Sequence, residues 1–359
     1  MPVTRGEMKQ HNDESLRGHI GGLDTIRFIC ALWVVMGHYG APPLPGFVDK
    51  SNIVGLITLG VYNNLTSGPA AVIVFFVISG LCIHYPYARE LRNPDVVAYL
   101  ARRYIRIVLP MAAAITIAQW ADVRLALFQQ TILWSLLAEL VYYTLYPVLL
   151  WLRRQLNGWT PIILIAYVAA LMVVATDPSA GDYPSYGVYL NWVLGIPCWL
   201  LGCVLAEKLC QVPDRKSAPF IWLWRFGILI LATICSIARF HSPIGYPWTL
   251  DFFAIAAAAW VFREAIYFRS IAPPRILEWA GGWSYSLYLV HAIAGNFLRK
   301  MLVGQFASLL GWCMLMSFVL LSSFVFALIF EFPSHKLAKY VARWIRGGKV
   351  SARASTERS

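Results

Sequence analysis

Long apolar runs, separated by prolines, glycines and charged residues, dominate the chain. Each run approaches the length of about 20 residues that an α-helix needs to cross a bilayer. The pattern therefore predicts about ten membrane-spanning helices. We expect them at residues 23–40, 69–85, 105–121, 131–151, 160–176, 186–206, 219–238, 248–264, 283–303 and 308–330.

Composition supports a membrane protein. The 359 residues are 59% hydrophobic and 13% charged, whereas soluble domains average about 25% charged residues. The 15 tryptophans and 18 tyrosines suit the aromatic belts at membrane interfaces. The seven cysteines are scattered without ligand spacing, so they predict neither a disulfide framework nor a metal site. The expected fold class is an all-α polytopic integral membrane protein.

The distribution of charge predicts the topology. A net charge of +12 could suggest a nucleic-acid binder. However, most of the 30 lysines and arginines fall in segments that the predicted spans place on the same side as the N-terminus. The positive-inside rule then places both termini in the cytoplasm, and we expect no nucleic-acid partner. We expect a polar N-terminus over residues 1–20, a membrane domain over 21–335 and a disordered basic tail over 336–359.

The first span carries an arginine and a histidine on one face. Arg27 and His38 are eleven residues apart, which is about three helical turns and roughly 16 Å along the axis. Asp24 lies three residues before Arg27 and can pair with it. Ionisable groups are costly at membrane depth and therefore indicate function. His38 seen alone would be an interface residue; on this face it can deprotonate a hydroxyl.

Two later spans carry comparable polar faces. In the fourth span, Ser135, Glu139 and Tyr142 follow helical spacing together with Tyr146. Glu139 either ties helices together or orients an imidazole or a substrate hydroxyl, and the two roles are compatible.

In the ninth span, Ser284, Tyr288 and His291 share a face. Hydrogen bonding between helices is the simpler explanation for them, but His291 is the second histidine in the middle of a span. Ser79, beside Gly80 in the second span, adds a polar group where helices can approach closely.

An arginine run precedes the third span. Arg102, Arg103 and Arg106 lie in ARRYIRIVLP, and Arg102 and Arg106 would share one side of a helix. The planar guanidinium donates paired hydrogen bonds to phosphate. A basic loop can equally anchor the chain against anionic lipid. The run is therefore a candidate phosphate site with a simpler alternative.

Six motifs in a fixed order carry a resemblance to a known family. They are LDTIRFICALWVVMGH, VFFVISGLCI, ARRYIRIVLP, TILWSLLAELVYYTLYP, GGWSYSLYLVH and FEFP, and they extend from about residue 22 to 335. In this order they resemble the membrane-bound acyltransferase family 3, whose members acylate extracytoplasmic sugars, usually in bacteria. We expect no counterpart of the SGNH domain that some members carry.

The resemblance implies roles for the residues matched. It implies His38 and Glu139 as catalytic residues, together with Arg27, which would also guide the donor. The arginines 102, 103 and 106 would hold acyl-coenzyme A, with acetyl-coenzyme A as the expected donor and no metal. His291 matches the histidine of the SYSLYL motif. The acceptor would be a sugar or polysaccharide. The protein would cross a bacterial inner membrane many times, with lipid around it.

A second function stays open. A transporter or flippase for a lipid-linked sugar or an acylated metabolite would also bury ionisable residues, as proton relays. The chain has no evident repeats and no paired spans broken by Gly or Pro, which are typical of transporters. Homo-oligomer formation is left open.

Overall fold

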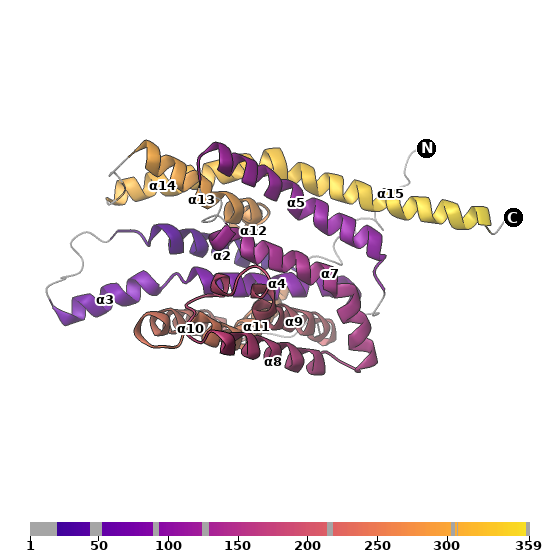
Figure 1. Ribbon diagram of the computed structural model, residues 1–359, viewed down its shortest axis with the longest axis horizontal. Helices are drawn as coiled ribbons and strands as arrows, with labels where there is room; N and C mark the ends of the chain where they lie inside the picture. Colours follow the sequence, from indigo (N-terminus) through magenta and orange to yellow (C-terminus); the bar gives the residue numbers. More distant parts are fainter. Residues whose placement is uncertain are drawn as a thin grey trace.

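Every element that the structure describes is a helix (Figure 1). The computed structural model describes residues 20–43, 52–88, 93–123, 129–213, 218–302, 306 and 308–356. Nearly all of the polar segment predicted at 1–20 lies outside them. The helices are α2 (Leu23–Tyr39), α3 (Ile53–Asn64), α4 (Gly68–Ala88), α5 (Val96–Trp120), η1 (Gln129–Leu133), α7 (Trp134–Gln155), α8 (Thr160–Thr176), η2 (Tyr183–Tyr186), α9 (Asn191–Gln211), α10 (Ile221–His241), α11 (Tyr246–Ser270), α12 (Arg275–Gly281), α13 (Ser284–Met301), α14 (Leu309–Phe326), η3 (Ala327–Glu331) and α15 (Phe332–Thr356).

Side-chain caps mark where several of these helices begin. The side chains of Asn52, Asp95 and Ser308 accept hydrogen bonds from backbone amides three residues later, at distances of 2.7, 3.3 and 3.1 Å. Such caps satisfy amide groups that the first helical turn leaves unpaired. The capping residues thus fix the starts of α3, α5 and α14.

Each predicted span coincides with a helix, although several boundaries differ. The arginine run predicted to precede the third span lies inside α5, because Asp95 caps that helix several residues earlier than expected. Five stretches are long and apolar enough to cross a membrane by length and composition within the described residues. They are Ile53–Ala88, Trp134–Gln155, Asn191–Gln211, Ile221–His241 and Leu309–Gly347.

The C-terminal segment differs from the expected disordered tail. The structure describes α15 as one helix from Phe332 to Thr356. Ser334, Ala338 and Ala342 are buried, at 1–3% exposed, and α15 packs along α5 (Figure 1). Small residues one turn apart allow this close packing, but they add little hydropathy to a segment rich in charge. The composition therefore gave no indication of this helix.

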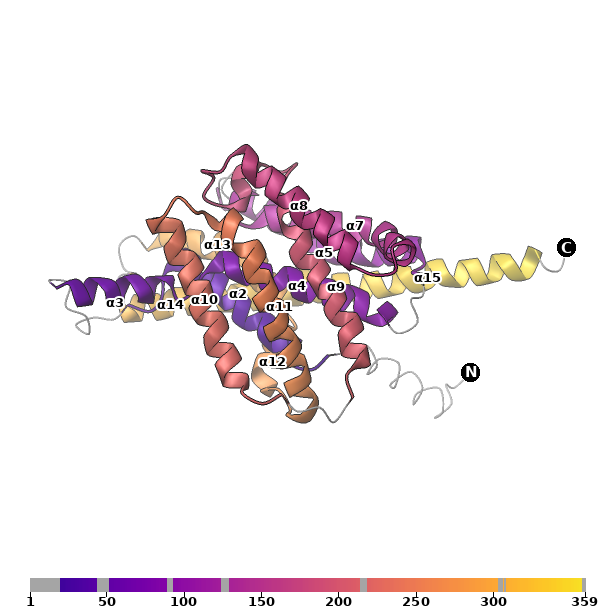
Figure 2. The same ribbon diagram turned by 90° about the horizontal axis from the view of Figure 1, so that it is seen from below.

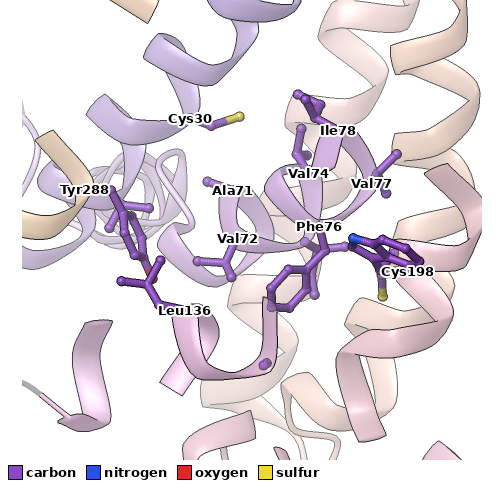
Figure 3. Packing of buried hydrophobic residues seen from close by; sticks show 14 of the residues in the cluster. Cys30, Ala71, Val72, Val74, Phe76, Val77, Ile78, Leu136, Cys198 and Tyr288 are labelled. Carbon is purple, nitrogen blue, oxygen red and sulfur yellow. The ribbon is translucent and has the colours of Figure 1, made fainter. Parts of the chain in front are cut away.

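Helix α4 lies at the centre of the bundle and packs most extensively on α9. A Cβ atom at Gly80 would lie 1.9 Å from the Trp199 carbonyl oxygen, and one at Gly202 would lie 2.0 Å from the Val77 carbonyl oxygen. The two backbones are thus in direct contact. Figure 3 shows α4 side chains such as Phe76 between Tyr288 on one side and Cys198 on the other.

The two ends of the bundle are distinct. In both views α3 projects from one end, whereas the C-terminal part of α15 projects from the opposite end (Figure 1, Figure 2).

Helix α2 packs against α4, α12 and α13. Glu331 in η3 accepts hydrogen bonds from the Ser286 amide at 3.0 Å and hydroxyl at 2.5 Å. This buried carboxylate therefore holds the start of α15 against α13.

The contact between α4 and α9 can be tested with an added methyl group. We expect Gly80→Ala to lower the free energy of unfolding in mixed micelles by about 2 kcal/mol or more, because the methyl would overlap a backbone carbonyl. The matched control is Gly227→Ala on α10, where no atom lies within 4 Å of the added Cβ. That variant should be neutral or more stable by about 0.5–1 kcal/mol. Equal stability of both variants would contradict the close contact.

Candidate functional site

The N-terminal end of α2 is held by the carboxylate of Glu278. Glu278 of α12 accepts hydrogen bonds from the Gly22 amide, the Thr25 amide and the Thr25 hydroxyl at 3.1, 3.1 and 2.7 Å. A negative charge at a helix N-terminus is favourable because the amides there are unpaired. Sequence reasoning missed Glu278, since its partners lie far away along the chain. This anchor sets the position of the two candidate residues that follow.

Asp24 and Arg27 form the predicted ion pair. The Arg27 guanidinium donates to Asp24 Oδ1 at 2.6 Å, and its second nitrogen lies 3.2 Å from Cys82 Sγ of α4. Both side chains are about a quarter exposed or less, at 26% and 22%. Asp24 thus fixes the orientation of Arg27 and directs part of the guanidinium toward α4.

At the other end of α2, His38 lies against His291 of α13. Their ring centroids are 5.1 Å apart and the planes are tilted by 37°. His38 is exposed, whereas His291 is fully buried. Tyr39 secures the contact because its hydroxyl donates to the His291 carbonyl oxygen at 3.0 Å. Arg299 lies over the ring of Tyr39, 4.6 Å from its centroid.

The hydrogen bonds of His291 define what its ring can do. Nδ1 lies 2.7 Å from the Tyr288 carbonyl oxygen and 3.2 Å from the Leu287 carbonyl oxygen. Carbonyl oxygens only accept, so Nδ1 carries the hydrogen. Nε2 is buried without a hydrogen-bond partner in the described residues. The ring therefore presents an unused acceptor beside an exposed histidine.

Ser135 and Tyr288 extend this cluster to α7. The Ser135 hydroxyl lies 2.6 Å from the Tyr288 hydroxyl, and the Tyr288 ring is 6.1 Å from that of His291. The polar faces predicted on the fourth and ninth spans thus meet inside the bundle. We call His38, His291, Tyr288 and Ser135 the histidine cluster.

Glu139 belongs to a neighbouring polar group. It accepts from the Ser79 hydroxyl at 2.5 Å and from the Tyr143 hydroxyl, and Trp199 donates to Ser79 at 3.3 Å. No hydrogen bond joins Glu139 to His38 in the part of the chain that the structure describes. The expectation that Glu139 orients this imidazole therefore has no contact behind it.

Tyr142 does not join Glu139, and the neighbouring Tyr143 contacts the carboxylate in its place. Tyr142, predicted to share the polar face of Glu139, instead donates to the Trp192 carbonyl oxygen at 2.9 Å. Tyr143 contacts the carboxylate because it lies one full turn beyond Glu139. That spacing of four residues was a signal available in the sequence.

The three arginines of α5 form a cationic group. Arg103 lies over the rings of Tyr99 and Tyr143, 5.9 and 5.7 Å from their centroids, and its Nε has no hydrogen-bond partner among the described residues. Arg106 is half-buried and interacts electrostatically with Arg103, Arg27 and Glu331. Arg102 is exposed. No ion pair of these three arginines is found in the described part of the chain, and cations gathered in this way suit a polyanionic ligand.

Other polar groups lie apart from these clusters. His84 bonds Tyr146 and Glu207 at 2.9 and 3.1 Å, and Glu207 also pairs with Arg153 at 2.8 Å. A pocket of about 220 Å³ beside Glu207 contains none of the predicted site residues in its lining. The described residues hold no group of three or more His, Cys, Asp or Glu side chains suited to a metal.

A bundle of long apolar helices that encloses histidine, carboxylate and arginine groups is typical of a helical membrane protein. Comparison with known families shows to which family of membrane proteins the chain belongs. The acyltransferase domain of acyltransferase family 3 matches residues 20–329, so the chain belongs to this family. It is therefore an acyltransferase of the membrane. No curated protein and no solved structure matches the chain.

The hydrogen-bond geometry of His291 predicts one tautomer. Nitrogen NMR of histidine-labelled protein, with His291→Asn used to assign the signal, should show the hydrogen on Nδ1 and a bare Nε2. The reason is that both neighbours of Nδ1 are carbonyl oxygens. A signal typical of a protonated Nε2 and a bare Nδ1 would contradict this geometry.

Proposed function

We propose that the protein transfers an acyl group from acyl-coenzyme A across the membrane to a hydroxyl of an extracytoplasmic sugar or polysaccharide. The observation that carries this proposal is the placement of two groups along α2. Arg27 interacts electrostatically with Arg106 of α5, and His38 contacts His291. The part of α2 between Arg27 and His38 is roughly 16 Å long. Family membership supports acyl transfer in general.

The proposed topology has ten spans with both termini in the cytoplasm, in the inner membrane of a bacterium. Each predicted span coincides with a helix. This topology places the segment between the first two predicted spans outside, and it contains α3, which projects opposite to the C-terminal end of α15 (Figure 1, Figure 2). The basic residues predict the arginine end as the cytoplasmic one. His38 would then face the outside and lipid would surround the bundle.

The donor would enter from the cytoplasm. Its phosphates would bind Arg102, Arg103 and Arg106, because a charged nucleotide needs cationic partners and cannot cross lipid. Arg27 would guide the uncharged pantetheine arm from the phosphates into the bundle. We propose acetyl-coenzyme A as the donor. Glu139 interacts electrostatically with Tyr288, and it would accept a hydrogen bond from an amide of that arm.

The chemistry would take place at the histidine cluster. His38 is exposed and can take the proton from the acceptor hydroxyl. The hydroxyl oxygen then attacks the thioester carbonyl, the carbon–sulfur bond breaks, and the proton passes to the leaving thiolate. His291 can only accept at Nε2, so it would position His38 by receiving its N–H. The other nitrogen of His38 would then be free to act as the base.

The histidines can be tested by substitution. We expect His38→Ala to lower acyl transfer by about 100-fold or more, because a positioned base contributes about 10²–10⁴ to rate. His291→Asn should lower the rate less, since it removes only the positioning contact. The measurements are the acyl mass on surface glycans and the turnover of acetyl-coenzyme A by purified protein.

The control is His241→Ala, which alters an exposed histidine at the end of α10. It should keep full activity, and all three variants should purify as folded protein. Full activity of His38→Ala would exclude it as the base. Absence of any transfer from acetyl-coenzyme A, together with transport of a lipid-linked sugar, would instead favour a flippase.

A further inference from the structure

The packing of α15 brings a second set of basic side chains to the arginines of α5. The helix starts at the Glu331 anchor and runs along α5, with Ala338 and Ala342 buried in the contact. His335 interacts electrostatically with all three α5 arginines and with Lys339. Arg346 interacts with Arg102. Two helices far apart in sequence thus contribute to one cationic group.

Among the described residues, most of these basic side chains form no ion pair, and only His335 pairs with a carboxylate, that of Glu331. Within the described residues, no ion pair is formed by Arg102, Arg103, Arg106, Lys339 or Arg346. Asp24 already accepts a hydrogen bond from Arg27, and Glu331 accepts one from Ser286 and also pairs with His335 Nε2 at 3.8 Å. In the part of the chain that the structure describes, Arg103 Nε and His335 Nε2 are buried without a hydrogen-bond partner, Glu331 being 3.8 Å from the latter. Like charges held this close repel one another unless an anion lies between them.

The same helix also carries basic residues that face away from α5. Lys336 and Arg343 are exposed, as are Lys339 and Arg346, but they lie further round the helix from Ala338 and Ala342. A helix that bound only lipid headgroups would use these outward residues at least as much. The cations on the side nearer α5 can instead reach a ligand that contacts both helices at once.

We propose that His335, Lys339 and Arg346 of α15 complete the phosphate site of the α5 arginines, so that the nucleotide phosphates of the donor lie between the two helices. This inference rests on the proposed function. Coenzyme A carries a diphosphate and a separate ribose phosphate, which is enough negative charge to engage cations from two helices. The pantetheine arm carries no comparable charge.

The test compares two double variants of the full chain in nanodiscs of zwitterionic lipid. Lys339→Glu with Arg346→Glu should raise the Kd for coenzyme A by about tenfold or more, because each removes a contact to a charged group. Lys336→Glu with Arg343→Glu changes the same charge on the same helix and should stay within about twofold. Dephospho-coenzyme A should show a smaller difference between the two pairs.

The outcomes separate this inference from the function on which it rests. If the unaltered protein does not bind coenzyme A, the proposed function and this site fail together. Normal binding with equal effects of the two pairs would overturn only the role of α15. A difference that appears only with anionic lipid would assign these cations to headgroups. Lys339→Gln with Arg346→Gln keeps the test decisive if charge reversal prevents folding.

Discussion

The backbone contact between α4 and α9 is the constraint on which the rest of the structure depends. Gly80 and Gly202 allow the two helices to touch. Such packing matters because lipid tails are as apolar as the side chains, so the hydrophobic effect does not hold helices together within the bilayer. Helix α4 then presents Ser79 to Glu139 and Cys82 to Arg27. On its other side it receives α2, where a Cβ at Gly37 would lie 3.3 Å from the Gly68 amide. The position of α4 therefore fixes both the carboxylate group and the helix that carries His38.

Much of the fold follows from hydropathy, because crossing a bilayer demands long apolar helices. Each predicted span coincides with a helix. Helices α3, α12 and α15 were not predicted, since short length or high charge hides them from a hydropathy argument. In α15 the decisive feature is Ala338 and Ala342 packed on α5. Small residues signal close packing only when the partner helix is known.

The site was predictable where residues share one helix, and less so where partners come from different helices. Spacing alone paired Asp24 with Arg27. The same reasoning selected Glu139 and His38 but could not tell which side chains each of them would contact. The structure brings His38 to His291 and gives Glu139 to Ser79 and Tyr143. Helix rotation and crossing determine these contacts, and neither is encoded in local spacing.

The central claim is that donor and acceptor meet from opposite sides of one bundle, with the arginines at one end and the histidine cluster at the other. Vectorial transfer in sealed proteoliposomes of known orientation tests it most directly. With acetyl-coenzyme A only on the side of the α5 arginines and the acceptor only on the other, the acceptor should become acylated. Product that forms only when donor and acceptor share one side would contradict the account.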